Sequence, residues 1–179
     1  YDGMLIVGGH FAQAGELAVE NIAAFDGTDW HALGDGIYGG FSEPEVMAMS
    51  ILDGKLIAAG AFTDAGAGPA NFVAEWDGTD WSPLGEGADF AILAAETYNG
   101  ELYIGGQFNS AGGVAGTQRI AKCDGSAWSS VNGGVPTRVV RRPSTVRTAL
   151  YVAGHFGVIV GIVTPGLGGG VGPLLHPLG

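Results

Sequence analysis

The chain has 179 residues, of which 46% are hydrophobic, 14% are charged and 34 are glycine, and its formal net charge is −11. This length is typical of one domain, the apolar content excludes a disordered acidic chain, and the negative charge excludes a nucleic-acid partner because a phosphate backbone would be repelled. Glycine at this density, without the three-residue period of collagen, predicts many tight turns between short strands.

Two sequence blocks recur along the chain. The first has the form Leu-x-x-x-Gly-x-Phe-x-x-Ala-Gly and occurs at residues 5–15, 56–66 and 102–112, with a partial copy at 150–156. The second has the form Ile/Val-Ala-x-x-Asp-Gly-x-x-Trp and follows each complete copy, at residues 22–30, 73–81 and 120–128. Both blocks stay in phase, so the chain is built from repeats of about 46–51 residues.

In chain order, the repeats divide the sequence into an incomplete first unit at 1–40, complete units at 41–87 and 88–134, and a degenerate start of a fourth at 135–156. Each complete unit predicts two hairpins, because Asp-Gly between apolar runs indicates a tight turn. In the second unit the turns lie at Asp53-Gly54, between 47–52 and 55–59, and at Asp77–Asp80, between 72–76 and 81–84. Four short antiparallel strands per unit are therefore expected.

Consecutive apolar residues at 91–95 and 102–104 predict sheets that are covered on both faces by neighbouring sheets. The Gly-Gly pairs at 8–9 and 105–106 leave room for close backbone packing. Four-stranded repeats of this length are typical of the blades of a β-propeller. We therefore predict an all-β fold, a partial β-propeller over residues 1–156, and a fragment of a longer propeller because a ring needs about four to eight blades.

The composition changes near residue 125. All 18 acids lie between Asp2 and Asp124, whereas the last 55 residues hold four bases and no acid. One interpretation is that parts of 137–149 and 157–179 are translated out of the original frame; the alternative is a degenerate last blade followed by a Gly/Pro-rich apolar tail, disordered over 157–179. This tail is long enough to span a membrane, but its glycines and prolines disfavour a transmembrane helix.

The repeat resembles a known family of propellers. The strand Leu-Tyr-Ile-Gly-Gly-x-Phe at 102–108, followed by Ile-Ala-x-x-Asp-Gly-x-x-Trp at 120–128, is similar to the kelch or galactose-oxidase type of repeat. It is most similar to the WDG-rich variant of secreted bacterial surface proteins and fungal cortical polarity proteins. The gap between Trp76 and Trp81 is shorter than the kelch pattern, so the repeat is a relative of that pattern. The resemblance implies an extracellular or cell-surface location.

Few residues suggest chemistry. His10 and His155 occupy the same repeat position, before a phenylalanine, and are weak candidates for a metal site because a third ligand is lacking. Tyr38, Glu43 and Glu45 lie on the long loop 34–45 and are weak candidates for binding a ligand or partner. No catalytic triad and no cofactor motif is found, so no cofactor is expected.

Two further features have structural interpretations. The carboxylates Asp26, Asp29, Asp77 and Asp80 could be calcium ligands, but the third copy drops the second carboxylate, so we interpret the first Asp of each pair as a turn residue that accepts backbone N–H bonds. Cys123 stands where other units have Phe25 and Trp76, so it is interpreted as a packing residue.

These observations favour a non-enzymatic binding or scaffold module that presents its loops to a protein or glycan partner. The alternative is a fragment of a propeller enzyme, an oxidase or a carbohydrate-active hydrolase or lyase, whose catalytic residues lie on missing blades. A third expectation is that the fragment has no independent function and self-associates, because its open blade edges can pair with other chains.

Overall fold

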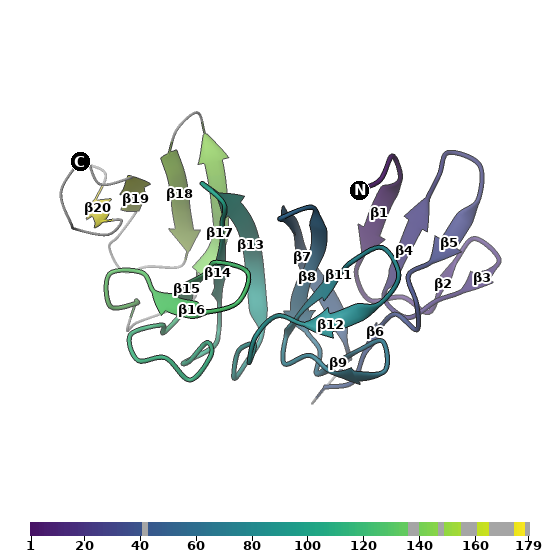
Figure 1. The fold of residues 1–179 in the computed structure, drawn as a ribbon, viewed down its shortest axis with the longest axis horizontal. Helices are drawn as coiled ribbons and strands as arrows, with labels where there is room; N and C mark the ends of the chain where they lie inside the picture. Colours follow the sequence, from purple (N-terminus) through teal and green to yellow (C-terminus); the bar gives the residue numbers. More distant parts are fainter. Residues whose placement is uncertain (41–42, 136–139, 147–148, 155–160, 165–173, 178–179) are drawn as a thin grey trace.

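The computed structural model describes residues 1–40, 43–135, 140–146, 149–154, 161–164 and 174–177. Every regular element in these ranges is a β-strand, and the strands form antiparallel sheets of two to four strands (Figure 1). The predicted all-β class with short antiparallel strands is confirmed.

Two four-stranded sheets correspond to the two complete repeat units. Their strands pair in the orders β7-β8-β11-β12 and β13-β14-β15-β16. Both hairpins predicted for the second unit are confirmed, because β7 pairs with β8 across 53–54 and β11 pairs with β12 across 77–80. The bounds are Glu45–Leu52 (β7), Lys55–Ala61 (β8), Val73–Trp76 (β11) and Trp81–Pro83 (β12), then Ile92–Tyr98 (β13), Glu101–Gly106 (β14), Ile120–Cys123 (β15) and Trp128–Ser130 (β16).

Two further sheets flank this pair. The first has three strands in the order β1-β4-β5, and the last has four in the order β17-β18-β19-β20. The bounds are Leu5–Gly8 (β1), Ile22–Phe25 (β4), Trp30–Ala32 (β5), Val140–Val146 (β17), Ala149–Gly154 (β18), Gly161–Thr164 (β19) and Leu174–Pro177 (β20). Parts of the predicted tail at 157–179 are thus strands, while 155–160 and 165–173 lie outside the described residues. The frame change stays a prediction.

The opening strand of each four-stranded sheet has the same irregularity. Its register shifts between Val46 and Ala48 in β7, between Ile92 and Ala94 in β13, and between Val140 and Arg142 in β17. A bulge of this kind bends a strand and increases its twist. The three strands also contact one another in succession, β7 with β13 and β13 with β17. The sheets are therefore equivalent units stacked through their opening strands (Figure 1).

Short strands lie in the connections between the sheet strands. Gln13–Ala14 (β2) pairs with Leu17–Ala18 (β3), and Asp64–Ala65 (β9) pairs with Gly68–Pro69 (β10) and with Ile37–Tyr38 (β6). The sequence analysis did not predict these strands. They make the connections compact rather than open loops.

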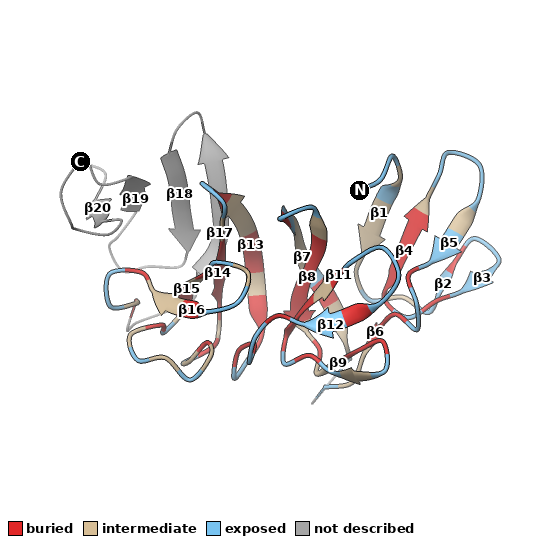
Figure 2. Ribbon diagram, viewed as in Figure 1, coloured by how far each residue is buried: buried red, intermediate tan, exposed pale blue. Residues whose placement is uncertain are grey.

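The core lies between successive sheets (Figure 2). Strand β8 illustrates why the strands of this fold have consecutive apolar residues. Leu56 and Ala58 pack in one buried cluster with β4 of the first sheet, whereas Ile57 and Ala59 pack in another with β14 of the third. Because alternate side chains of a strand point to opposite faces, both faces of this sheet are covered. The prediction of two-sided cover was made from residues 91–95 and 102–104 of the third unit, and it agrees with β14, where Leu102, Tyr103 and Ile104 are all buried.

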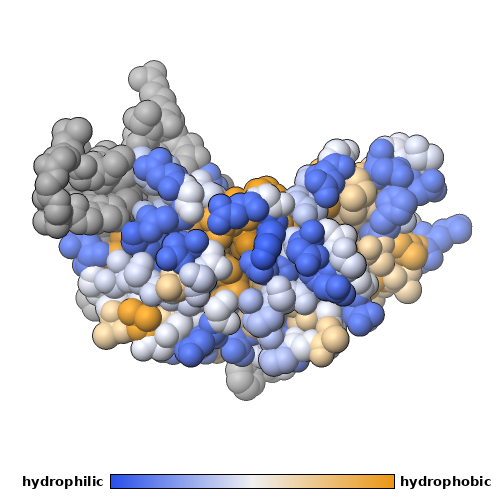
Figure 3. Space-filling model, in the orientation of Figure 1, coloured by the Kyte–Doolittle hydropathy of each residue, from blue (hydrophilic) through white to orange (hydrophobic). Residues whose placement is uncertain are grey.

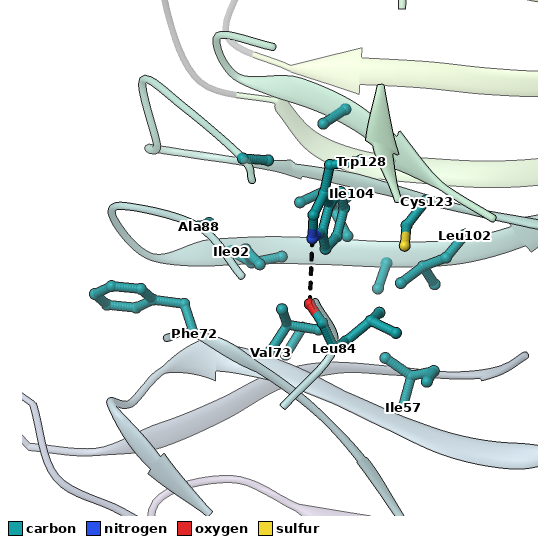
Figure 4. Packing of buried hydrophobic residues seen from close by; sticks show 14 of the residues in the cluster. Ile57, Phe72, Val73, Leu84, Ala88, Ile92, Leu102, Ile104, Cys123 and Trp128 are labelled. Atoms are coloured by element: carbon teal, nitrogen blue, oxygen red, sulfur yellow. Dashed lines mark hydrogen bonds between the residues drawn. The ribbon is translucent and has the colours of Figure 1, made fainter. Parts of the chain in front are cut away.

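A tryptophan at the start of the fourth strand connects each of the second and third sheets to the sheet before it. The indole N–H of Trp81 donates to the carbonyl of Leu33 at 2.8 Å, and that of Trp128 donates to the carbonyl of Leu84 at 3.2 Å (Figure 4). Both indoles are buried. In the first unit Trp30 is only half-buried, and no group in the described part of the chain accepts from its indole. The same bond thus recurs at the junction of the first and second sheets and at the junction of the second and third sheets.

The Ala-Gly turn of each first block lies against the tryptophan of its own unit. Gly112 has a φ of +58°, and a Cβ there would lie 2.7 Å from Cδ1 of Trp128. Gly15 lies equally close to Trp30, where the corresponding distance is 2.9 Å. Glycine is required at this position both for its left-handed backbone and for the approach of the ring. The spacing between the two sequence blocks thus reflects a side-chain contact.

We predict that Trp81→Phe lowers the free energy of unfolding by about 1–3 kcal/mol, because it removes the bond to the Leu33 carbonyl and leaves a small gap. The matched control is Trp30→Phe, which loses no such bond. Urea denaturation followed by far-UV circular dichroism measures both. Equal losses in the two variants would show that the bond between sheets contributes nothing.

We also predict that Gly112→Ala destabilises the fold by about 1–3 kcal/mol through strain and overlap with Trp128. Gly133→Ala provides the control, because Gly133 has a φ of +82° but nothing within 4 Å of its added Cβ. Thermal denaturation should show a larger loss for the variant at 112. If both variants lose the same stability, backbone strain alone explains why glycine occupies position 112.

Candidate functional site

The two ends of the sheets carry different connections. The hairpin turns at 53–54 and 99–100, with the Asp-Gly turns at 26–29, 77–80 and 124–127, lie at one end because antiparallel strands alternate in direction. The described long connections lie at the other end, at 9–21, 33–40 with 43–44, 62–72, 84–91 and 107–119 (Figure 1). A ligand that contacts several units would meet them at this loop end.

A hollow of about 400 Å³ opens at the loop end between the first and second sheets. It is lined by His10, Glu43, Glu45, Met47 and Ala61. The backbone positions these groups: Val46 N–H donates to the carbonyl of Gly9 at 3.0 Å, and Glu45 pairs with Ala61 at the edge of the second sheet. The structure therefore brings together three residues that the sequence analysis selected separately, namely His10, Glu43 and Glu45.

Close packing of β1 on β7 brings His10 close to Glu43 and Glu45. A Cβ on Gly8 would lie 2.6 Å from Cγ1 of Val46, so only glycine allows β1 to approach this closely. Gly106 is also in close contact with backbone, next to the carbonyl of Ala91. The prediction that the Gly-Gly pairs leave room for close packing is confirmed at both positions.

His10 is held by the loop that carries the acids. Its Nδ1 lies 2.8 Å from the carbonyl oxygen of Pro44, and its Nε2 lies 3.7 Å from Oε2 of Glu43. Since a carbonyl oxygen only accepts, Nδ1 carries the hydrogen. Nε2 therefore faces Glu43 and is free to accept a hydrogen bond or, when protonated, to pair with the carboxylate. The side chains of His10 and Glu43 are 50% and 85% exposed.

The chemistry of the hollow favours a cationic or hydrogen-bond-donating group. Two carboxylates and an imidazole provide acceptors, and Met47 and Ala61 provide an apolar wall. Within the described ranges, no group of three or more His, Cys, Asp or Glu side chains is arranged to hold a metal ion. His155, the other weak metal candidate, lies outside the described residues.

Tyr38 does not line the hollow. Its hydroxyl donates to the carbonyl of Gly66, and its strand β6 pairs with β9 in the neighbouring connection. This geometry gives Tyr38 a role in holding two connections together. The sequence could not separate it from Glu43 and Glu45, because all three lie on one loop.

The sequence analysis missed Met47 and Ala61 as lining residues. A signal for Ala61 was present, because Ala61 occupies the same repeat position as His10. Equivalent positions in adjacent sheets are neighbours at the loop end, so this alignment marks two walls of one hollow. Met47 gave no comparable signal.

The Asp-Gly turns and Cys123 have the structural roles that the sequence analysis assigned. Oδ1 of Asp77 accepts from the backbone N–H of Thr79 and Asp80 at 2.8 and 2.9 Å, and these bonds lower its pKa. Equivalent bonds occur at Asp26 and Asp124. Cys123 is fully buried in the core between the second and third sheets, and this burial raises its thiol pKa.

Comparison with known proteins adds no family assignment. A scan against protein-family models finds no matching family, and a search of curated proteins finds no match. The described residues contain no helix with the length and hydropathy that a membrane span requires.

We predict that Asp26 titrates with a pKa of about 2, below the ordinary value of 3.8, because it accepts bonds from the turn backbone and from His31. A lowered folded-state pKa stabilises the fold above about pH 4, and this contribution is lost as the pH falls through the folded pKa. NMR titration of the side-chain carboxyl measures the value. His31→Ala should raise the pKa of Asp26 and leave that of Asp77 unchanged; an unmoved Asp26 would contradict the contribution of His31.

Proposed function

We propose that the sheets are blades of an incomplete β-propeller of the kelch or galactose-oxidase type. Three features support this proposal: four-stranded meanders in succession, opening strands that contact one another in turn (β7 with β13, and β13 with β17), and one bond type joining neighbouring sheets. The expectation of a secreted or cell-surface protein depends on the resemblance of the repeat alone.

We further propose that the chain is a non-enzymatic binding module whose loop end receives a basic segment of a protein partner. The hollow at His10 is the observation that carries this proposal, since it combines two carboxylates with an apolar wall. A lysine or arginine side chain has the matching chemistry, an apolar stem and a cationic head.

The charge of the surrounding loops agrees with a basic partner. The described long connections carry seven acids and a single base, Arg119, whose Nη1 donates to the carbonyl of Gln107. Hydrophilic side chains cover much of the face seen in Figure 3. An acidic surface attracts a cationic segment over distances of about 10 Å at ordinary salt. A protein partner therefore fits these observations better than a neutral glycan.

We predict that a labelled peptide of alternating Gly and Arg binds the protein, and that Glu43→Gln and Glu45→Gln each weaken binding about two- to fivefold. Fluorescence anisotropy at low and high salt measures the affinity. Asp2→Asn removes one charge at the opposite, hairpin end and serves as the matched control.

Equal loss in all three variants would show a diffuse charge effect and contradict a site at the hollow. Tight binding of a neutral oligosaccharide, together with no binding of the Arg peptide, would assign the loop end to a glycan instead. Preserved far-UV circular dichroism shows that the variants remain folded.

A further inference from the structure

The aromatic side chains of Phe72 and Phe90 form a pair at the loop end, at the junction of the second and third sheets. Their ring centroids are 6.0 Å apart, and Phe90 is 43% exposed whereas Phe72 is buried. Phe90 lies in the connection from β12 to β13, which joins these two sheets, and both sheets have all four strands. The proposed contact at His10 does not include this pair.

Phe72 has a backbone conformation that a bulky residue rarely adopts. Its φ is +70°, in the left-handed region, where a large side chain is strained. The equivalent residues of the first and third units are Asn21 and Arg119, with φ values of +62° and +65°, and all three donate the same backbone bond to the phenylalanine of their own first block.

The side chain at this position differs in what it does. The side chains of Asn21 and Arg119 bond to nearby backbone groups, whereas the phenyl ring of Phe72 can form no such bond. Figure 4 shows this ring at one margin of the buried cluster, turned away from Leu102 and Cys123. Strained residues of this kind gather at binding sites, and here the strain positions a ring beneath the exposed Phe90.

Hydrogen bonds to both units fix the segment that carries Phe90. On the side of the second unit, Ala88 N–H donates to the carbonyl of Asn71 at 3.0 Å. On the side of the third unit, Oδ1 of Asp89 accepts from the backbone N–H of Asn109 at 2.7 Å. An exposed ring on a fixed backbone loses little conformational entropy on binding, as the anchor residues of protein interfaces do.

The aromatic pair adjoins the hollow through Ala61. This residue lines the hollow, and Phe72 bonds to the chain on both sides of it. Gly60 N–H donates to the Phe72 carbonyl at 3.0 Å, and Phe72 N–H donates to the Phe62 carbonyl at 2.9 Å. Since paired chains lie about 4.8 Å apart and the two rings 6.0 Å apart, a short extended segment, at about 3.3 Å per residue, reaches from the hollow to Phe90.

The charge around the pair favours a basic segment. The two connections that carry the rings hold three acids, Asp64, Glu86 and Asp89, and no base. Arg119, in the neighbouring connection, donates to a backbone carbonyl. A cationic segment is therefore attracted to this surface before its apolar groups meet the rings. Charge and apolar contact together indicate one kind of occupant.

We propose that Phe72 and Phe90 form a second contact for the basic segment and receive a large apolar side chain of that segment. This inference rests on the proposed function and specifies the partner further. The segment has a basic residue at the hollow and, a few positions away along the same extended chain, an aromatic or large aliphatic residue on the Phe90 ring. Phe72 supports this ring from the core side.

The test compares two labelled peptides on the full chain, one of alternating Gly and Arg and the same peptide with one central Gly replaced by Trp. We expect about fivefold tighter binding of the Trp peptide to the unsubstituted protein. In Phe90→Ala this gain should disappear, while the affinity for the Gly–Arg peptide stays the same. Fluorescence anisotropy gives all four affinities, and their cycle isolates the contact between Trp and Phe90.

Ile51→Ala is the matched control. Ile51 is 44% exposed, as Phe90 nearly is, but it lies beside the turn at 53–54, at the hairpin end. This variant should keep the whole gain from Trp. Phe72→Asn tests the supporting ring, because asparagine tolerates the left-handed backbone and already stands at the equivalent Asn21. It should reduce the gain, and far-UV circular dichroism checks that each variant is folded.

A Trp gain that survives in Phe90→Ala, or no gain in the unsubstituted protein, would overturn the proposal. So would loss of the gain to a competing neutral oligosaccharide, which would assign the rings to a glycan, or a dimer that only Phe90→Ala dissociates, which would assign them to a second copy. Glu43→Gln should weaken both peptides equally and keep the gain. Failure of the Gly–Arg peptide to bind contradicts the loop-end function itself, so the two failures are distinguishable.

Discussion

The tryptophan that begins the fourth strand is the group on which the stacking of the sheets depends. In the third unit, the Trp128 ring lies on the Ala-Gly turn of its own unit, and its N–H crosses to the Leu84 carbonyl of the preceding one. The Trp128 side chain therefore holds two connecting segments in place, one in its own unit and one in the preceding unit. Because a buried indole N–H requires a partner, the leucine carbonyl has to lie at one place, and the sheets adopt one relative position. Length differences between repeats are taken up in loops outside this contact.

Much of the fold follows from local sequence. Asp53-Gly54 determines a tight turn whatever surrounds it, because its backbone conformation is specific to few residues. The consecutive apolar residues at 102–104 predict burial on both faces, which neighbouring sheets provide. Because the sequence blocks repeat, the same turns and strands are predicted for the other units. These are the reasons that strands, hairpins and two-sided packing could be predicted from the residues alone.

The hollow and the indole bonds could not be predicted in the same way. Glu43 and His10 are far apart in sequence, and their meeting depends on how closely Gly8 lets β1 approach Val46. The short strand Asp64–Ala65 depends on a connection from another unit, since it pairs with Ile37–Tyr38. Such features arise from packing between units, and no periodicity within one unit encodes them. The repeat alignment of His10 with Ala61 was the one usable clue.

The exposure of Trp30 has a spectroscopic consequence. Trp76, Trp81 and Trp128 are buried, whereas Trp30, beside Gly15, is only partly buried. A soluble quencher such as acrylamide therefore reaches Trp30 first, and the quenchable part of the intrinsic fluorescence reports on the first sheet. The remaining emission comes from the buried tryptophans Trp76, Trp81 and Trp128, which lie in the sheets that follow the first. One protein without any attached dye thus provides separate optical signals for its first sheet and for the interfaces in its interior.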